Sequence, residues 1–130
     1  MNINDYIAYV ESLIHSSPII VGYHLKIDRK TENIVFISGN ADFRDASVLD
    51  FKEFIEKTEE GIEKHKYGYN YRRGSDVLFR YDNAPDPGAR GLASFPHHKH
   101  TENGEITESR PVKLRDVLEE IERLILDNSS

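Results

Sequence analysis

The segment Val21-Gly22-Tyr23-His24-Leu25-Lys26-Ile27-Asp28 indicates a β-sheet protein, because apolar and polar residues alternate along it. This alternation places the apolar side chains on one face of a β-strand and the polar side chains on the other. Turn-forming segments follow at residues 29–32, 43–47 and 72–76. Further strands are predicted at residues 34–43, 48–54, 67–71 and 77–81. Because the turns are short, we expect an antiparallel meander, and we expect the charged segment 56–63 to be a surface loop.

An amphipathic helix is predicted on each side of this run of strands, at residues 3–15 and 114–125. Apolar residues recur at the helical spacing of i, i+3, i+4 and i+7 in both segments. The buried positions that this spacing predicts include Ile7, Val10, Ile14, Leu118, Ile121 and Ile125. We therefore predict an α+β fold with a single domain over residues 1–130. An antiparallel β-sheet of about five or six strands is flanked in it by an N-terminal and a C-terminal α-helix.

The composition excludes several classes of protein. The chain has 130 residues, enough for one domain, and its 17 Lys and Arg against 23 Asp and Glu give a net charge of -6. This charge does not hold the whole chain to nucleic acid or to an anionic membrane. The absence of cysteine excludes disulfides, thiolate zinc sites and a thiol nucleophile. Neither a long apolar run nor a signal-peptide pattern occurs, so the cytoplasm is the expected location.

The segment 64–100 differs in charge from the rest of the chain. It contains seven Lys and Arg against three Asp and Glu, a local charge of +4, whereas the remainder carries −10. It also holds four of the six histidines and four of the seven tyrosines. A basic and aromatic surface of this kind can bind a phosphodiester. The alternative is a solvated polar face of a hairpin together with a loop.

The segment Phe95-Pro96-His97-His98-Lys99-His100 is the densest group of chemically reactive side chains. In an extended segment, His98 and His100 point to one side, and His97 and Lys99 point to the other. Two imidazoles at this spacing can divide the roles of base and acid, share a metal ion, or cap backbone groups. A metal site needs further ligands, and spacing does not choose among the candidates Asp82, Glu53 and His97. We therefore expect no metal and no cofactor.

Arg80 and Asp82 end a predicted strand and begin the loop that leads to these histidines. Asp82 either orients an imidazole or forms a turn with its own backbone, and Arg80 would be a fixed cation. The loop contains three prolines that favour a defined path, so we expect it to bring His98 and His100 beside Arg80 and Asp82. Glu53 lies either in an apolar setting that requires a partner, such as Arg80 or a histidine, or at an exposed strand end.

The alternating tyrosines at positions 67, 69 and 71 share one face of a predicted strand. They form either a platform on which RNA bases stack or, more commonly, a half-buried sheet face with hydroxyl groups at its rim.

Four segments and the last helix resemble the TumE family, small proteins assigned as toxins of two-gene toxin–antitoxin systems in bacteria and archaea. In chain order the segments are Ser47-Val48-Leu49-Asp50-Phe51-Lys52-Glu53, Tyr67-Gly68-Tyr69, Arg80-Tyr81-Asp82-Asn83-Ala84-Pro85 and Phe95-Pro96-His97-His98-Lys99-His100. The resemblance implies a cognate antitoxin encoded nearby, often one with a helix-turn-helix. The family often has histidine after Ala-Pro, where this chain has Asp86, so a site that used that histidine is altered or absent here.

The resemblance and the residues together predict a toxin that acts on RNA as a metal-independent endoribonuclease. His98 and His100 would be base and acid, because an imidazole with a pKa of about 6.5 serves both roles near neutrality. The full set of predicted catalytic residues is His98, His100, Arg80, Asp82 and Glu53, and the predicted RNA-binding residues are Lys99, His97, Tyr69 and Tyr71.

Two alternative functions differ in what the histidines do. One is a non-catalytic module that binds a protein or a nucleic acid and whose histidines are structural. The other is a metal-dependent hydrolase. The candidate partners are the antitoxin, RNA and a second copy of the chain in a homodimer, and no membrane is expected.

Overall fold

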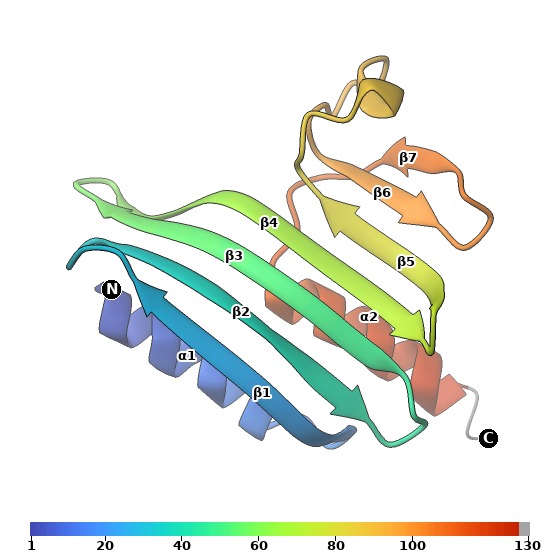
Figure 1. Cartoon of the computed structure of the whole chain (residues 1–130), viewed down its shortest axis with the longest axis horizontal. Helices are drawn as coiled ribbons and strands as arrows, with labels where there is room; N and C mark the ends of the chain where they lie inside the picture. Colours follow the sequence, from blue (N-terminus) through green and yellow to red (C-terminus); the bar gives the residue numbers. More distant parts are fainter. Residues whose placement is uncertain (128–130) are drawn as a thin grey trace.

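The computed structural model describes residues 1–127, and within them the chain forms one sheet of seven strands with a helix before it and a helix after it (Figure 1). In chain order the elements are α1 (Ile3–His15), β1 (Ile20–Arg29), β2 (Ile34–Phe43), β3 (Val48–Thr58), β4 (Gly61–Arg73), β5 (Asp76–Asp82), the 3-10 turn η1 (Pro87–Ala89), β6 (His98–Thr101), β7 (Ile106–Glu108) and α2 (Leu114–Asp127).

The strands cross the sheet in chain order, and every neighbouring pair is antiparallel. The predicted α+β class with flanking helices is confirmed. The predicted number of about five or six strands is wrong, because the sheet has seven. The two unpredicted strands, β6 and β7, have four and three residues. They are too short to show an alternating pattern, and β6 consists of His98-Lys99-His100-Thr101, which has no apolar residue.

The charged segment 56–63 is part of a hairpin and is not the surface loop that we expected. β3 continues to Thr58 and β4 begins at Gly61, so two residues lie between the paired strands. Gly61 has a φ of +124°, which favours glycine. His65 Nε2 lies 2.8 Å from Glu56 Oε1 across this hairpin. Across this hairpin, polar residues pair between the strands in place of alternating apolar residues. Hydropathy alone therefore does not predict that β3 and β4 extend through residues 56–63.

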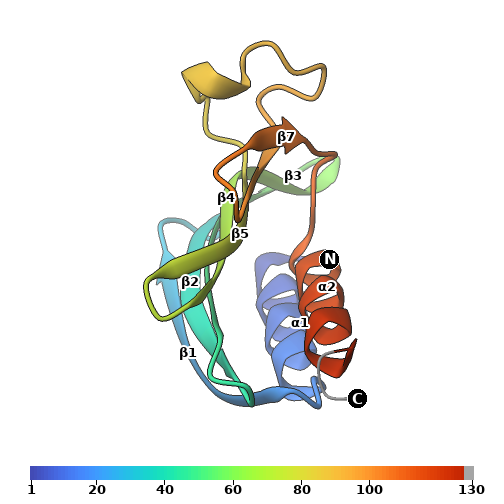
Figure 2. The same cartoon turned by 90° about the vertical axis from the view of Figure 1, so that its right-hand side faces the viewer.

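Both helices pack on the same face of the sheet (Figure 2). A capping box of Asn2 and Asp5 begins α1. The helix residues that the apolar stripes predict to be buried are all buried: Ile7, Val10, Ile14, Leu118, Ile121 and Ile125. They belong to one core with Ile37, Leu49 and Tyr69 of the sheet. Burial of each such aliphatic side chain contributes about 1.5–3 kcal/mol, so the helices hold this face firmly.

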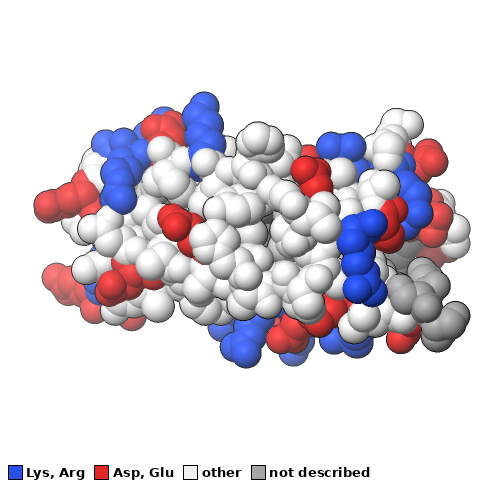
Figure 3. Space-filling view, turned by 90° about the horizontal axis from the view of Figure 1, so that it is seen from below, with Lys and Arg blue, Asp and Glu red and all other residues white. Residues whose placement is uncertain are grey.

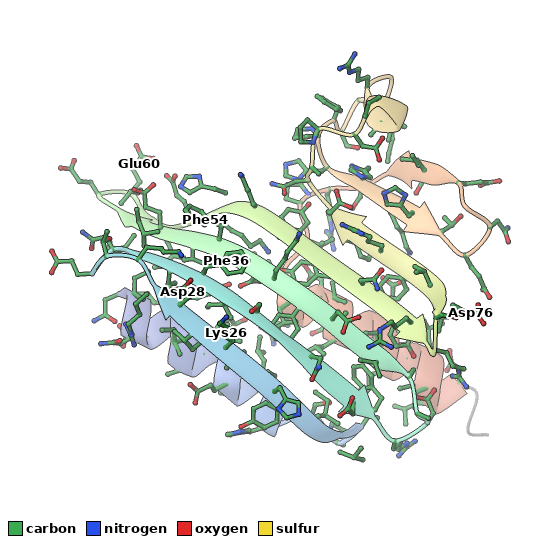
Figure 4. The ribbon with its side chains drawn as sticks, in the orientation of Figure 1. Lys26, Asp28, Phe36, Phe54, Glu60 and Asp76 are labelled. Atoms are coloured by element: carbon green, nitrogen blue, oxygen red, sulfur yellow. The ribbon has the colours of Figure 1, made fainter. Side chains whose placement is uncertain are left out.

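The other face of the sheet carries no helix in residues 1–127, and we call it the open face (Figure 2). Phe36 of β2 and Phe54 of β3 are register partners, and Asp28 of β1 pairs with Phe36. Figure 4 shows Phe36 and Phe54 side by side on this face. The open face thus presents aromatic and polar side chains toward the solvent.

Figure 3 shows the molecule from the side of the edge strand β1. Charged side chains gather toward the two ends and the rims of this view, and mostly uncharged residues occupy its middle. Val21 of β1 is 70% exposed and is one of the exposed large apolar residues. None of the helices within residues 1–127 is long and apolar enough to cross a membrane.

Candidate functional site

Strands β5 and β6 bring four of the predicted site residues together. In their register Arg80 lies opposite His100, and Asp82 lies opposite His98. The alternate residues of β5, Phe79 and Tyr81, pack toward the core on the helix side. Because side chains alternate along a strand, Arg80, Asp82, His98 and His100 project from the open face.

The connection between β5 and β6 is held by side-chain hydrogen bonds. The backbone N–H of Ala84 donates to Asp82 Oδ1 at 3.0 Å, so the aspartate also begins the loop. Asp86 caps the turn η1 with its side chain. Near the end of the loop, Ser94 Oγ donates to the backbone carbonyl of His97 at 2.7 Å. These bonds take the place of ladder hydrogen bonds and return β6 to the edge of β5.

The core of the site is a compact group of one carboxylate and two imidazoles. His98 and Asp82 are only 1% and 4% exposed. His98 Nε2 lies 3.1 Å from Asp82 Oδ1 and 3.1 Å from His100 Nε2. His100 Nε2 lies 3.7 Å from Asp82 Oδ2, and the side chain of His100 is 27% exposed. The group is therefore buried on the side of His98 and reaches the solvent at His100.

Neighbouring groups fix the orientation of this core. His98 Nδ1 lies 2.7 Å from the backbone oxygen of Pro96, and a carbonyl only accepts, so Nδ1–H is the donor. In neutral His98, Nε2 therefore carries a lone pair that faces Asp82 and His100. Arg80 Nε donates to Asp82 Oδ2 at 3.0 Å. Asp82, His98 and His100 each offer one ligand atom, and these atoms lie within 4.8 Å of one another.

Two shallow grooves on the open face meet beside this core. One has a volume of about 840 Å³ and is lined in part by Asn70, Arg80 and His100. The other has a volume of about 520 Å³ and is lined in part by Lys52, Asn70 and Arg80. Arg80 therefore stands where an extended ligand in either groove would meet the buried carboxylate and imidazoles.

Comparison with protein families identifies the chain. The family model described as toxin TumE matches residues 10–125, which include every strand of the sheet together with Asp82, His98 and His100 of the core of the site. The chain belongs to the TumE family. This confirms the resemblance carried by the four sequence segments. No curated protein and no solved structure matches this TumE chain.

Glu53 of this TumE chain lies on the helix-covered face and does not join the core of the site. Its side chain is 1% exposed and accepts hydrogen bonds from the hydroxyl groups of Tyr6, at 2.5 Å, and Tyr69. Lys64 Nζ lies 3.7 Å from Glu53 Oε2. The expected apolar setting with a partner is present, but the partners are two tyrosines and a lysine instead of Arg80 or a histidine.

Burial and the Glu53 carboxylate perturb the groups around Glu53. Burial, reinforced by Glu53, raises the pKa values of the Tyr6 and Tyr69 hydroxyls well above their ordinary value. Burial lowers the pKa of Lys64, although Glu53 opposes this shift. These shifts belong to a closed polar cluster under α1, because Tyr6 comes from the helix and the other members from β3 and β4.

The predicted RNA-binding residues do not lie with the core of the site. Lys99 Nζ donates to Glu120 of α2 at 3.0 Å, on the helix side. Burial opposes the charge of Lys99, but hydrogen bonds with Tyr81 and Glu120 hold its pKa above the ordinary value. The His97 ring stacks on Tyr67 with 5.8 Å between ring centroids. Burial, followed by the charge of Lys64, lowers the pKa of His97.

The tyrosine ladder is part of the core of the protein. Tyr69 and Tyr71 are 0% and 2% exposed, so their rings are not accessible for stacking on RNA bases. The interpretation of the ladder as a sheet face is correct, although the rings are more deeply buried than the half-buried face that we expected. The +4 segment 64–100 is likewise divided between two faces: Lys64 and Lys99 face the helices, whereas Arg80 faces the grooves.

Three residues near the core of the site were not predicted as site residues. Asn70 and Lys52 line the grooves, and Asp86 Oδ2 lies 4.0 Å from His100 Nε2. The alternation along β4 places Asn70 on the face opposite the tyrosines, which is a signal that the sequence offers. Asp86 is recognisable only as a departure from the family pattern, and Lys52 carries no sequence signal that separates it from other surface lysines.

Proposed function

We propose that this TumE chain acts as a toxin by cleaving RNA, and that the reaction takes place at Arg80, Asp82, His98 and His100. The observation that supports this proposal most is the convergence of an accessible guanidinium with a buried Asp–His pair beside two grooves. Membership of the toxin TumE family supports the biological role.

Arg80 is suited to hold the scissile phosphate. Its side chain is 43% exposed, and among the described residues its hydrogen bond to Asp82 uses only Nε. The two Nη groups are therefore available for the phosphate oxygens, which a guanidinium binds in a bidentate manner. Charge that develops on the phosphorane would then be stabilised in place by a cation that Asp82 already orients.

The predicted metal-independent mechanism requires His98 and His100 to act on opposite sides of the phosphorus. The attacking and leaving oxygens of phosphoryl transfer are roughly in line. Each imidazole would have to lie about 2.6–3.2 Å from a different one of these oxygens. The two Nε2 atoms are 3.1 Å apart, which leaves no room for a phosphate group between them. The arrangement therefore favours one reactive centre over a separate base and acid, unless the rings move apart.

We also propose that a cognate antitoxin masks this site, that the protein acts in the cytoplasm, and that RNA is the substrate. Family membership suggests the antitoxin. An acidic partner surface over the grooves would pair with Arg80 and exclude RNA. A homodimer stays a prediction.

A non-catalytic binding module is the second candidate. It is favoured by the burial of His98 and by its bond to the carbonyl of Pro96, both of which suit a structural histidine. In that case the open face would bind a partner without cleaving it. Substitution of Arg80 would then weaken the binding of that partner and would not affect any cleavage.

Inducible expression in a bacterial host without the neighbouring gene tests the proposal, with growth and the integrity of total RNA as measurements. We expect wild type to stop growth and fragment RNA, and Arg80→Ala to lose about a hundredfold in cleavage rate. Arg72→Ala is the matched control, because Arg72 also pairs with an aspartate, Asp50, at the sheet surface. Normal growth and intact RNA with soluble wild-type protein would contradict the proposal, as would an Arg80→Ala variant of full toxicity.

A further inference from the structure

Three atoms that could serve as metal ligands converge at the core of the site. They are Asp82 Oδ1, His98 Nε2 and His100 Nε2, with 3.1 Å for both the Asp82–His98 and the His98–His100 distance. The Nδ1–H of His98 is already used on Pro96, so neutral His98 has no proton to offer at Nε2. The lone pair of His98 Nε2 and the Asp82 carboxylate repel each other in this buried place unless a proton or a metal ion lies between them.

The spacing of the three atoms suits a metal ion. Ligands at 2.0–2.1 Å from a tetrahedral zinc ion are separated from one another by about 3.3 Å. The Asp82 Oδ1–His98 Nε2 and His98 Nε2–His100 Nε2 separations are both 3.1 Å, and all three ligand atoms lie within 4.8 Å of one another. The other carboxylate oxygen, Asp82 Oδ2, lies 3.7 Å from His100 Nε2. A small shift of these side chains would place all three at bonding distance from one ion.

The groups behind the three residues are those that metal ligands usually have. The carbonyl of Pro96 accepts the Nδ1–H of His98, which fixes the tautomer that a metal requires. Arg80 and the backbone N–H of Ala84 donate to Asp82 and hold its carboxylate in place. Asp86 Oδ2 lies 4.0 Å from His100 Nε2, at the exposed side of the group. A fourth position could therefore be filled by Asp86 or remain open toward the groove.

We propose that Asp82, His98 and His100 form a binding site for one divalent transition-metal ion, with Zn²⁺ as the best match. Two imidazoles and one carboxylate favour Zn²⁺ and its first-row neighbours over Mg²⁺ or Ca²⁺, which prefer oxygen ligands. From the sequence we expected no metal. The pairing of β6 with β5 brings the three possible ligands together, and residue spacing along the chain does not reveal this pairing. Metal binding does not depend on RNA cleavage. If RNA is the substrate, an ion with one coordination position left open would supply the single reactive centre. In that position the ion would activate a bound oxygen, as metal ions do in other enzymes.

Metal titration of the purified full-length chain tests the site. The protein is first dialysed against EDTA, and Co²⁺ is then added as a spectroscopic probe, with zinc content after dialysis against Zn²⁺ measured separately. We expect one ion per chain and visible absorption bands of a four- or five-coordinate Co²⁺ site. His100→Gln should bind at least about a hundredfold more weakly, because loss of a group behind a ligand already costs roughly 10–100-fold.

His100 is the residue to substitute because it is partly exposed, so the variant should fold, and circular dichroism verifies this. The matched control is His65→Gln, which removes an exposed histidine that lies 2.8 Å from a carboxylate of Glu56 and should leave the titration unchanged. Absence of stoichiometric metal in wild type would overturn the proposal, and so would equal binding by folded His100→Gln. Either result would leave the RNA-cleavage proposal standing, because no RNA enters the measurement.

Discussion

Glu53 and Asp82 are both buried carboxylates of the same sheet, but they lie on opposite faces and have different surroundings. Glu53 is contacted by donors: two tyrosine hydroxyls and the ammonium group of Lys64. Asp82 also has donors, but it shares its space with the Nε2 atoms of two histidines. A carboxylate surrounded by donors is satisfied, whereas one that faces further acceptors needs a proton or a metal ion between them. The comparison indicates that Glu53 serves the fold and Asp82 serves the site.

Substitution of Glu53 should give the largest loss of stability. Glu53→Ala leaves the ammonium group of Lys64 without its carboxylate and two buried hydroxyl groups without an acceptor. Removal of one partner of a buried pair costs about 3–5 kcal/mol of unfolding free energy. Urea denaturation measures the loss. Glu56→Ala, on the same strand but partly exposed, should cost no more than about 0.5 kcal/mol. If the two variants were equally stable, Glu53 would not hold α1 to the sheet.

The two histidines of the site should differ in their effect on stability. His98→Ala removes the donor to Pro96 and a buried ring, and should cost about 1–3 kcal/mol. His100→Ala removes a partly exposed ring and should stay within about 0.5 kcal/mol of wild type. Denaturation in the presence of a chelator separates this effect from metal binding. Equal losses for both variants would contradict the burial gradient across the core of the site.

Alkaline pH should weaken the helix-covered face. Burial raises the pKa of Tyr67 to about 12, and that of Tyr69 is also raised, whereas an unfolded chain releases these protons near the ordinary value of 10.0. The folded state therefore holds more protons above pH 10, and the stability present below that pH is lost as the pH rises through the folded pKa values. The lowered pKa of Lys64 acts with the opposite sign, but a single group does not cancel several tyrosines.

The slope is at most about 1.4 kcal/mol per pH unit for each tyrosine. Denaturation at a series of pH values between about 9 and 11 measures it, and Tyr69→Phe should reduce it. A stability that stays constant over this range would show that the tyrosines ionise freely in the folded protein.

A small effect is expected at the Tyr81–Glu120 contact on the helix side. Tyr81 Oη–H donates to Glu120 of α2 at 2.6 Å. Tyr81→Phe should lower the unfolding free energy by about 0.5–1.5 kcal/mol and leave RNA cleavage unchanged, because the hydroxyl group points away from the open face. Thermal unfolding and a cleavage assay measure the two effects. Loss of cleavage without loss of stability would show that part of the site lies on the helix side of the sheet and not on the open face.

The sequence predicts the helices and the long strands well because their signal is local. The apolar stripes of α1 and α2 identify the correct buried residues. The alternation over residues 21–28 lies within β1, and the predicted strand at residues 34–43 coincides with β2. The convergence of Arg80 and Asp82 with His98 and His100 also follows from the local alternation of β5 and β6, once a returning loop is assumed.

The relative faces of distant strands are not local information. Glu53 lies opposite Tyr67, whereas Asp82 lies opposite the adjacent residue Gly68. This offset of one residue places the two carboxylates on opposite faces of the sheet. This offset relates β3 to β5, which are separated in the sequence by the whole of β4, so the grouping of Glu53 with the histidines does not follow the structure. The position of Lys99 on the side opposite His98 and His100 follows instead from the local alternation of β6.

Cleavage of a defined RNA by purified protein, compared between His100→Ala and Glu53→Gln, shows on which face of the sheet the reaction takes place. His100→Ala removes an imidazole beside the buried carboxylate of the open face, and Glu53→Gln removes the charge of the buried carboxylate on the helix face. Rates are normalised to the folded fraction. We expect wild type and Glu53→Gln to cut at similar rates and His100→Ala to be slower by about a hundredfold or more. Full cleavage by His100→Ala, together with loss of cleavage in folded Glu53→Gln, would contradict the assignment of the reaction to Asp82, His98 and His100 and would place the reactive centre on the helix face.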